Sequence, residues 1–465
     1  MTDLAVQLDL PAAAPDDPHG IRIDNPADGT VVGRIAMAKE ADVAAAVASA
    51  AAARAMWART PAADRAAGLR AAAAAVRDRA DDLARVNELE TGKPLDEARA
   101  GVLAGAATLE QYAELGPVHR GKTLLGEVGA TDLMVPQPRG VVAVLTPWND
   151  PVAVACGLLG AALVTGNTVV HKPSERCPHT GLLLGELLAP HLPEGVLNCL
   201  AGDGSVGRWI TSSPDIDVIA HVGSSETGRA IARAAAETGA KVLLENGGND
   251  PLLVDAGVDP GWAAEQAATG AFANSGQICV AVERIYVHRA VAEPFLAALT
   301  ARADRLGLLP LVDARHRDKV HEHVTDAVAA GARLRAGGVL PGEPGTLYPA
   351  TVLSNCEPSM RVMREETFGP VAPVREVADF EQALAEAGDD RYGLAATVLT
   401  RSMENAQRAW RHLDVGTVKV NAVFGGAPGG AAQPRRASGQ GYGYGPELLD
   451  ELTTTKVVHL EPAPG

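Results

Sequence analysis

The sequence predicts an α/β protein built from two parallel-sheet units. Alanine-rich helical periodicity dominates residues 42–115, and from Gly140 onward short β-branched runs alternate with helical segments. Strands buried on both faces read as continuous apolar runs, which is the pattern of parallel sheets covered by helices. At roughly 100–200 residues per domain, a chain of 465 residues has room for two or three domains.

The expected elements follow the chain in order. Helices are expected at 42–58, 62–90 and 95–115, with the turn residues Thr91 to Pro94 as a break. From Gly140 onward, strands are expected at 141–145, 168–171, 218–222, 242–245 and 252–254, with a buried helix at 152–164. A second unit starts near Gly247 and is expected to contain helices at 262–274, 291–306 and 315–330 and strands at 284–288, 371–374, 395–400 and 417–420. Segment 425–445 is expected to be an ordered loop, followed by a strand-like tail at 453–460.

Composition excludes several functional classes. With 47% hydrophobic and 21% charged residues the chain can form a globular core. Its formal charge of −16 repels phosphate backbones and anionic lipids, so neither nucleic acid nor a membrane is expected as a partner. The five cysteines show no C-x-x-C spacing, so no metal site or disulfide framework is expected. The acidic N-terminal segment lacks the features of a signal peptide, which predicts a cytoplasmic protein.

Three residues are candidates for catalysis because of their settings. Cys279 follows a Gly-Gln turn at an element boundary, where backbone N–H groups favour a thiolate, although a free cysteine is more often an inert buried residue. Glu245 ends a predicted strand, where α/β sheets place ligands and acid–base groups; a turn carboxylate is the alternative. Asn149 follows another strand, and its amide suits a developing oxyanion. The neighbouring Asp150 and Pro151 are sufficiently explained as a helix start.

Two further strand ends suit a nucleotide. Lys172 and Glu175 offer donors and an acceptor for ribose hydroxyls, or else form a surface pair. Gly223 and Ser224 begin a predicted helix, whose N–H groups suit a pyrophosphate. The glycine spacing departs from G-x-G-x-x-G, so the glycines alone are a weak signal.

Taken in order, these motifs resemble the aldehyde dehydrogenase superfamily over nearly the whole chain. The matching motifs are Pro147-Trp148-Asn149, Gly166-Asn167, Lys172-Pro-Ser-Glu175, Gly223-Ser224, Glu245-x-Gly-Gly-Asn249, Gly276-Gln-x-Cys279 and Glu365-Glu366-Thr-Phe368-Gly369-Pro370. The resemblance implies a dinucleotide-binding domain (1–119 and 139–246), a catalytic domain (247–440), and a small β element for bridging and oligomerisation (120–138 and 441–465). It also implies a small-molecule aldehyde substrate and a homodimer or homotetramer.

The resemblance also implies a role for each site residue. Cys279 is expected to be the nucleophile, Asn149 with the Cys279 N–H the oxyanion hole, and Glu245 the base that activates water to hydrolyse a thioester. The residues expected to contact the cofactor are Trp148, Lys172, Glu175, Gly223, Ser224, Glu366 and Phe368. NAD is the expected cofactor because Glu175 would repel a 2′-phosphate, and NADP is the alternative because Arg176 is adjacent.

Several positions depart from the family pattern. Asn246 stands where Leu is common, His221 where Phe is frequent, and Leu158 where many relatives have Lys. Many relatives carry aromatic residues at four positions of the substrate wall. This chain has Asp150, Gly157, Gly426 and Ala432 there. A wider, less apolar tunnel is therefore expected, favouring aldehydes that bear an amino, hydroxyl or carboxylate group, the last met by Arg435 or Arg436.

Two other functions remain open at this point. A CoA-acylating semialdehyde dehydrogenase is disfavoured because such relatives usually lack the base that stands here as Glu245. A catalytically silent binding or structural protein would have no need of Asn149, Glu245 and Cys279 together.

Overall fold

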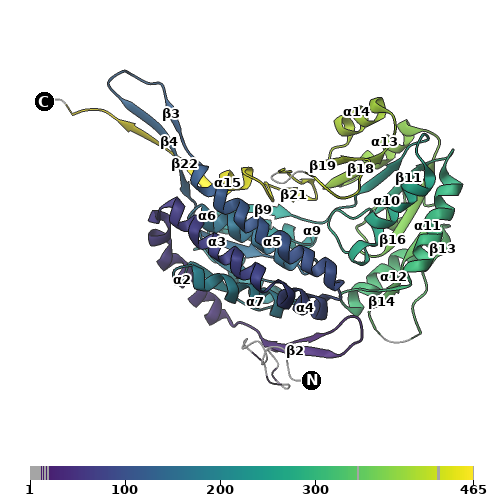
Figure 1. Ribbon diagram of the computed structural model, residues 1–465, viewed down its shortest axis with the longest axis horizontal. Coiled ribbons are helices and arrows are strands. Elements are labelled where there is room, and N and C mark those ends of the chain that lie inside the picture. Colours follow the sequence, from purple (N-terminus) through teal and green to yellow (C-terminus); the bar gives the residue numbers. More distant parts are fainter. Residues whose placement is uncertain are drawn as a thin grey trace.

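A six-stranded sheet forms the core of the first unit of the protein (Figure 1). The computed structural model describes residues 20–342, 345–426 and 430–463, together with residues 12, 14 and 17. The strand order is β21-β9-β8-β5-β6-β7, and every pair except β21 with β9 is parallel. The strands are β5 (Val141–Leu145), β6 (Thr168–Lys172), β7 (Leu197–Cys199), β8 (Val218–Val222), β9 (Lys241–Glu245) and β21 (Gly439–Gln440).

Helices cover both faces of this sheet. Along β5, Val142 and Val144 pack into one apolar cluster and Val141 and Ala143 into another, so side chains alternate between two buried faces. The first face carries α3 (Ala62–Asp78), α4 (Ala80–Thr91), α5 (Leu95–Leu115), α6 (Pro151–Val164) and α7 (Pro178–Leu188). The second carries α2 (Glu40–Arg59), α8 (Gly204–Thr211) and α9 (Ser225–Thr238).

A seven-stranded sheet forms the second unit. Its order is β13-β15-β16-β11-β10-β18-β19, parallel except for β13. The strands are β10 (Pro251–Val254), β11 (Arg284–His288), β13 (Arg333–Ala336), β15 (Thr351–Ser354), β16 (Val371–Val377), β18 (Ala395–Leu399) and β19 (Thr417–Val420). One face packs on α10 (Pro260–Phe272) and α11 (Ala292–Leu306), and the other on α12 (Ala314–Ala329), α13 (Phe380–Gly388) and α14 (Met403–His412). The fold class expected from the sequence is confirmed.

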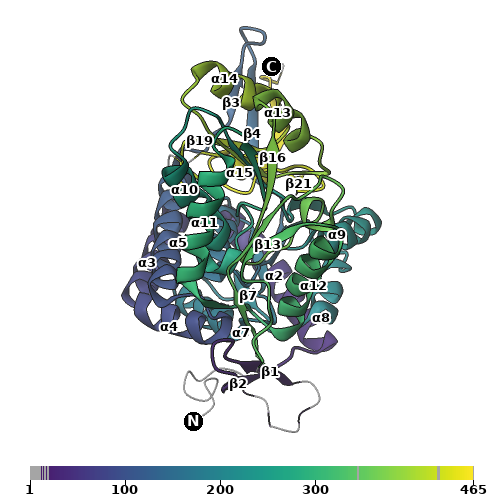
Figure 2. The same ribbon diagram turned by 90° about the vertical axis from the view of Figure 1, so that its right-hand side faces the viewer.

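A three-stranded antiparallel sheet projects from the body as an arm (Figure 1). It has the order β22-β4-β3, formed by β3 (Lys122–Leu124), β4 (Thr131–Pro138) and β22 (Thr453–Leu460), which follows the short helix α15 (Glu447–Glu451). The hairpin of β1 (Gly20–Asp24) and β2 (Val31–Ala36) lies at the opposite end of the molecule (Figure 2). Two minor ladders pair β12 (Leu308–Pro310) with β14 (Leu347–Pro349) and β17 (Tyr392–Gly393) with β20 (Arg435–Arg436).

Some local expectations differ from the structure. The helix expected over 62–90 is two helices, because Arg79 leaves the helical region at φ −107° and ψ 21°. The segment expected to be a loop at 425–445 contains β20 and β21, while residues 427–429 lie outside the described part. In that described part, no helix is both long and apolar enough to cross a bilayer.

Candidate functional site

A cleft of about 1040 Å³ opens at the carboxyl ends of β5, β6, β8 and β9. After β5 the chain adds β6 and β7 on one side and then returns to add β8 and β9 on the other. Open parallel sheets bind ligands at such a switch point. Segments of the second unit close the cleft, including Cys279, Lys319 and Glu366, so both units contribute to its wall.

A left-handed turn places Cys279 in this cleft. The three residues Asn274, Ser275 and Gly276 have φ values of 45°, 58° and 73°. A side chain at Gly276 would be impossible, since a Cβ there would lie 2.2 Å from the Gly369 carbonyl oxygen. The chain emerging from this turn brings the Cys279 Sγ to 3.8 Å from Glu245 Oε1, where the thiol donates to the carboxylate.

Side-chain amides connect this turn to the loop after β5. The Asn274 Nδ2 donates to the carbonyl oxygens of Asn149, at 3.3 Å, and of Gln277, at 3.2 Å. The Gln277 side chain in turn accepts from the Val312 N–H at 3.0 Å. Lys93 Nζ donates to the same Asn149 carbonyl at 3.4 Å. These bonds fix the main chain of Asn149 relative to Cys279, and both residues line the cleft.

Burial raises the pKa of both reacting groups. It raises the pKa of the Cys279 thiol well above its ordinary range, and the charge of Glu245 adds to that rise. Burial also raises the pKa of Glu245, which the hydrogen bond from Cys279 partly offsets. The Cys279 thiol is therefore protonated at neutral pH, and it lies beside the Glu245 side chain that is placed to accept its proton.

The end of the cleft where Lys172 and Glu175 are expected to contact an adenosine ribose is formed by β6, α8 and α9. Lys172 Nζ donates to the carbonyl oxygens of Pro173, at 2.8 Å, and Gly202, at 2.6 Å, which leaves one of its three protons for a ligand. Ser224 is the N-cap of α9, and its Oγ accepts from the Thr227 N–H at 3.2 Å. Glu175 and Gly223 line the same stretch of the cleft.

An aromatic group closes the opposite end. Trp148 packs edge-on against Phe368 at 5.6 Å and against His316 at 5.9 Å between ring centroids. Phe368 has the left-handed φ of 56°, and Glu283 stabilises it by accepting from the N–H groups of Thr367, at 3.0 Å, and Phe368, at 2.9 Å. His316 Nε2 lies 2.7 Å from the Phe368 carbonyl oxygen. The strained turn is thus held from both sides.

Glu366 lies between this group and Glu245. Its Oε1 accepts from the Gly248 N–H at 2.9 Å, and its carbonyl oxygen accepts from Lys319 Nζ at 3.1 Å. Burial raises the pKa of Glu366 to about 7. The glycines after Glu245 admit this approach, because a Cβ at Gly247 would lie 2.2 Å from Glu366 Oε2.

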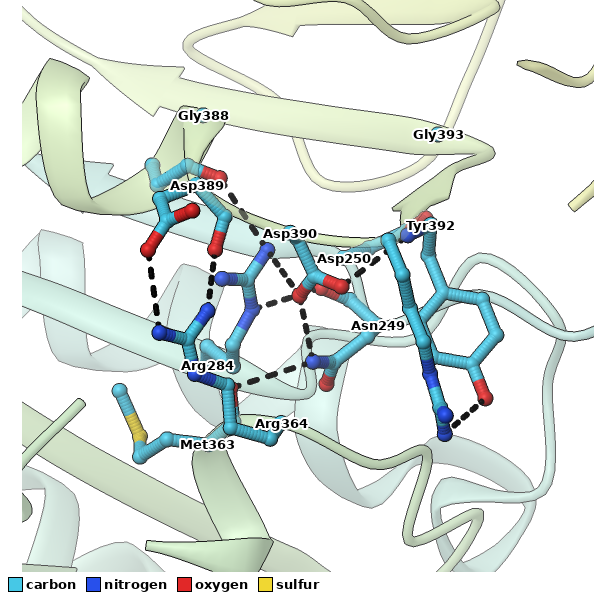
Figure 3. A network of polar contacts seen from close by, with 12 residues as sticks. Asn249, Asp250, Arg284, Met363, Arg364, Gly388, Asp389, Asp390, Tyr392 and Gly393 are labelled. Carbon is cyan, nitrogen blue, oxygen red and sulfur yellow. Dashed lines mark hydrogen bonds and ion pairs between the residues drawn. The ribbon is translucent and has the colours of Figure 1, made fainter. Parts of the chain in front are cut away.

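A buried polar network anchors the segment after Glu245 to the second sheet (Figure 3). Arg284 and Asp390 form an ion pair at 3.1 Å, with both side chains 3% exposed. Asn249 bridges them, since its Nδ2 donates to Asp390 at 2.7 Å and its carbonyl oxygen accepts from Arg284 Nε at 2.8 Å. The network restrains the backbone that connects Glu245 to β10.

All the site residues expected from the sequence line this one cleft, and their individual roles stay predictions. The sequence analysis did not single out His316 and Lys319, which reach the cleft from α12, or Arg208 from α8. No local motif marks these helix positions, so only the tertiary fold identifies them.

The residues expected to shape the substrate tunnel are engaged differently. Asp150 lies 3.2 Å from Lys93 Nζ in an ion pair at the start of α6. Arg435 and Arg436 each pair with Asp414 at 2.8 Å and do not line the cleft, so their expected contact with a substrate carboxylate stays a prediction. A Cβ at Gly157 would lie 2.9 Å from the ring of Tyr444, an aromatic residue that the sequence analysis had not placed there.

Comparison with known proteins gives one consistent result. A model described as the aldehyde dehydrogenase family matches residues 13–458. An E. coli NADP-dependent enzyme is 32% identical, with a TM-score of 0.92 and 96% of both chains covered. Betaine aldehyde dehydrogenase from Staphylococcus aureus, solved with NAD+, is 29% identical with a TM-score of 0.93, covering 97% of this chain and 94% of that one. PnpE, solved with nicotinamide adenine dinucleotide, is 31% identical with a TM-score of 0.92, covering 95% and 94%.

Proposed function

Because the chain belongs to the aldehyde dehydrogenase family, we propose that it oxidises its aldehyde to the carboxylic acid through a thioester on Cys279. Membership makes it an NAD(P)-dependent enzyme acting on aldehydes. One observation carries the proposed mechanism: the Cys279 thiol donates to Glu245 at 3.8 Å inside a cleft that Asn149 also lines. A nucleophile, a base and an oxyanion donor are thus together in one site.

The residues of the cleft fit a nicotinamide dinucleotide. Lys172 keeps one free proton, and the N-terminus of α9 begins at Ser224, a favourable position for a diphosphate. Glu366 and the aromatic group of Trp148 and Phe368 lie at the end that also contains Cys279. When bound, NAD(P)+ supplies the acceptor for the hydride.

The protein residues carry the remaining chemistry. Glu245 takes the thiol proton as the Cys279 Sγ bonds to the carbonyl carbon, and the Asn149 amide with the Cys279 N–H stabilises the oxyanion. Loss of hydride from the former aldehyde carbon leaves a thioester. Glu245 releases the thiol proton to solvent and then removes a proton from water, whose oxygen bonds to the acyl carbon while the carbon–sulfur bond breaks and Cys279 leaves as a thiolate. The raised pKa of Glu245 suits a group that both accepts and releases protons.

We propose that the two sheets divide this work. Residues 1–119 and 139–246 hold the cofactor, and residues 247–440 supply Cys279 and Glu366. Strand β21 (Gly439–Gln440) pairs with β9 of the first sheet, so the chain returns to the cofactor side at the end of the second range. This crossing joins the two walls of the cleft.

The proposed substrate class is a polar aldehyde. Asp150, which stands at a position expected to form the substrate wall, pairs with Lys93 beside the main chain of Asn149. A hydrophobic tail would gain little burial against them. We expect aldehydes that bear an amino, hydroxyl or carboxylate group to be preferred.

A panel of aldehydes assayed by cofactor absorbance tests activity and substrate together. We expect reduction of the cofactor that depends on aldehyde, with a higher kcat/KM for aminoaldehydes, hydroxyaldehydes or semialdehydes than for hexanal or benzaldehyde. Hexanal or benzaldehyde as the best substrate would contradict the polar class. Absence of turnover with the whole panel and both cofactors would contradict the proposed reaction.

The arm is proposed to join copies of the chain into a homodimer or homotetramer. Its apolar side chains Leu125, Val128, Val457 and Leu460 are exposed, which is unfavourable on an isolated surface. The outer strands β3 and β22 also leave backbone groups available for pairing. Replacing Leu125 and Val128 by Ser should reduce the mass of the assembly measured by analytical ultracentrifugation. An unchanged mass would show that this part of the arm does not join copies of the chain.

A further inference from the structure

His221 occupies the cofactor side of β8, two residues before Gly223. In the sheet register it lies between Leu145 of β5 and Leu244 of β9. Those two leucines pack into the apolar cluster beneath α2, α8 and α9, so the imidazole lies on the same face as the adenosine end of the cleft. The side chain is 7% exposed and lines the cleft.

Neither ring nitrogen of His221 makes a well-aligned hydrogen bond in the described part of the chain, although the Ser224 main chain lies close enough to raise the pKa of the ring. Both Nδ1 and Nε2 are buried and unpaired. Leaving a buried polar group without a partner costs about 1–3 kcal/mol, so such a group usually has a ligand or water as its partner.

The ring reaches the turn that begins α9. A Cβ at Gly223 would lie 2.7 Å from His221 Cε1 and 2.9 Å from Nε2, so only glycine admits the imidazole. The next residue, Ser224, is the N-cap of a 14-residue helix. The Nε2 edge therefore borders the helix N-terminus, where N–H groups favour an anion.

The protonation state suits a neutral donor. Burial lowers the pKa of His221 to about 4, which the Ser224 main chain offsets only in part, and the Lys172 ammonium lowers it further. At neutral pH the ring thus carries one N–H and one free lone pair. It adds a hydrogen-bond donor without adding charge.

We propose that His221 is a further cofactor-binding residue, which donates a hydrogen bond from its imidazole to a diphosphate oxygen of NAD(P). The two unpaired nitrogens, their position in the cleft and their contact with the Gly223 turn carry this inference. It rests on cofactor binding at the cleft as set out under the proposed function, but not on the reaction at Cys279. His221 would complement Ser224 and Lys172 in holding this end of the cofactor.

Binding of NAD+, ADP and AMP to His221→Phe and to the wild-type enzyme, measured by isothermal titration calorimetry, tests the proposal. The phenyl ring fills the same apolar position without a donor, so the apo variant should keep or raise its Tm. Loss of a hydrogen bond to a charged acceptor should raise the Kd for NAD+ and ADP about 10- to 100-fold. The substitution should weaken the binding of AMP, which lacks the second phosphate, less than it weakens the binding of ADP. His221→Gln, which retains a donor, should recover part of the affinity.

A matched control is His323→Gln. His323 is also fully buried, with Nδ1 3.1 Å from Thr367 Oγ1 and Nε2 3.7 Å from Glu365 Oε2, but it does not line the cleft. The control should bind ADP as the wild type does. If His221→Phe bound NAD+ and ADP within twofold of the wild type, or if AMP lost as much affinity as ADP, the assignment would be wrong while the reaction at Cys279 stood. A wild-type enzyme that bound neither NAD+ nor ADP would overturn the proposed function as well.

Discussion

Glu245→Gln separates the formation of the thioester from its hydrolysis. The substitution keeps the size of a buried side chain whose Oε1 lies 3.8 Å from the Cys279 Sγ, and removes the only base in that contact. Loss of a positioned general base slows a step by roughly 10²–10⁴-fold, which corresponds to about 3–5 kcal/mol on the hydrolysis barrier.

The same substitution should slow the formation of the thioester less than its hydrolysis. The charge of Glu245 adds to the raised pKa of the Cys279 thiol, so the neutral amide removes a repulsion that opposes thiolate formation. Loss of the proton acceptor and loss of this repulsion act in opposite directions on acylation. We therefore expect a single-turnover burst of reduced cofactor, followed by a steady state that is slower by the factor given above.

Stopped-flow absorbance of the reduced cofactor, with enzyme comparable in concentration to aldehyde, measures both phases. Glu237→Gln, which replaces an exposed carboxylate on α9, is the control and should match the wild type in both phases. An unchanged steady-state rate of acid formation in Glu245→Gln would refute the base assignment. It would instead favour transfer of the acyl group to CoA.

Three other predictions follow from the site. The rate at which iodoacetamide alkylates Cys279 in the apo enzyme should keep rising with pH up to the ordinary thiol pKa of 9.0, because burial raises the pKa of this thiol further. Peptide mass spectrometry measures this rate, and a plateau near neutral pH would contradict the prediction. Glu175→Gln removes a negative charge that would repel the 2′-phosphate of NADP+, so it should shift the ratio of kcat/KM for NAD+ over NADP+ toward NADP+ by at least ~10-fold. A wild-type preference for NADP+ would contradict this prediction. Asp390→Asn leaves the buried Arg284 guanidinium uncompensated, so chemical denaturation should show a loss of about 3–5 kcal/mol, and an unchanged midpoint would show that the pair is dispensable.

Much of the fold was predictable because local patterns and tertiary structure agree. Strands 141–145 and 218–222 were expected with the bounds they have, since a buried parallel strand is a short apolar run between turn signals. The break at Arg79 was not expected because no glycine or proline marks it. The β1–β2 hairpin was missed for a related reason, because its short strands carry charged residues and only partial alternation.

The site also contains residues that local motifs identify and residues that only tertiary packing places there. Cys279, Glu245 and Asn149 were identifiable because each follows a turn or strand end with a recognisable motif. His316 and Lys319 were not, because helix positions reach a cleft only through packing of one unit against another. The pairing of Arg435 and Arg436 with Asp414 also depends on contacts between separate segments, so no local motif could predict it. The cytoplasmic location expected from the N-terminal segment stays a prediction.

The most direct test of the covalent mechanism is the mass of the enzyme during turnover. Glu245→Gln mixed with NAD+ and a good aldehyde should be quenched in acid, weighed intact and then digested. The account predicts one acyl group per chain, located on the peptide that contains Cys279 and absent from the matching Cys279→Ala sample. An acyl group on another cysteine, or none at all while reduced cofactor still forms, would contradict it.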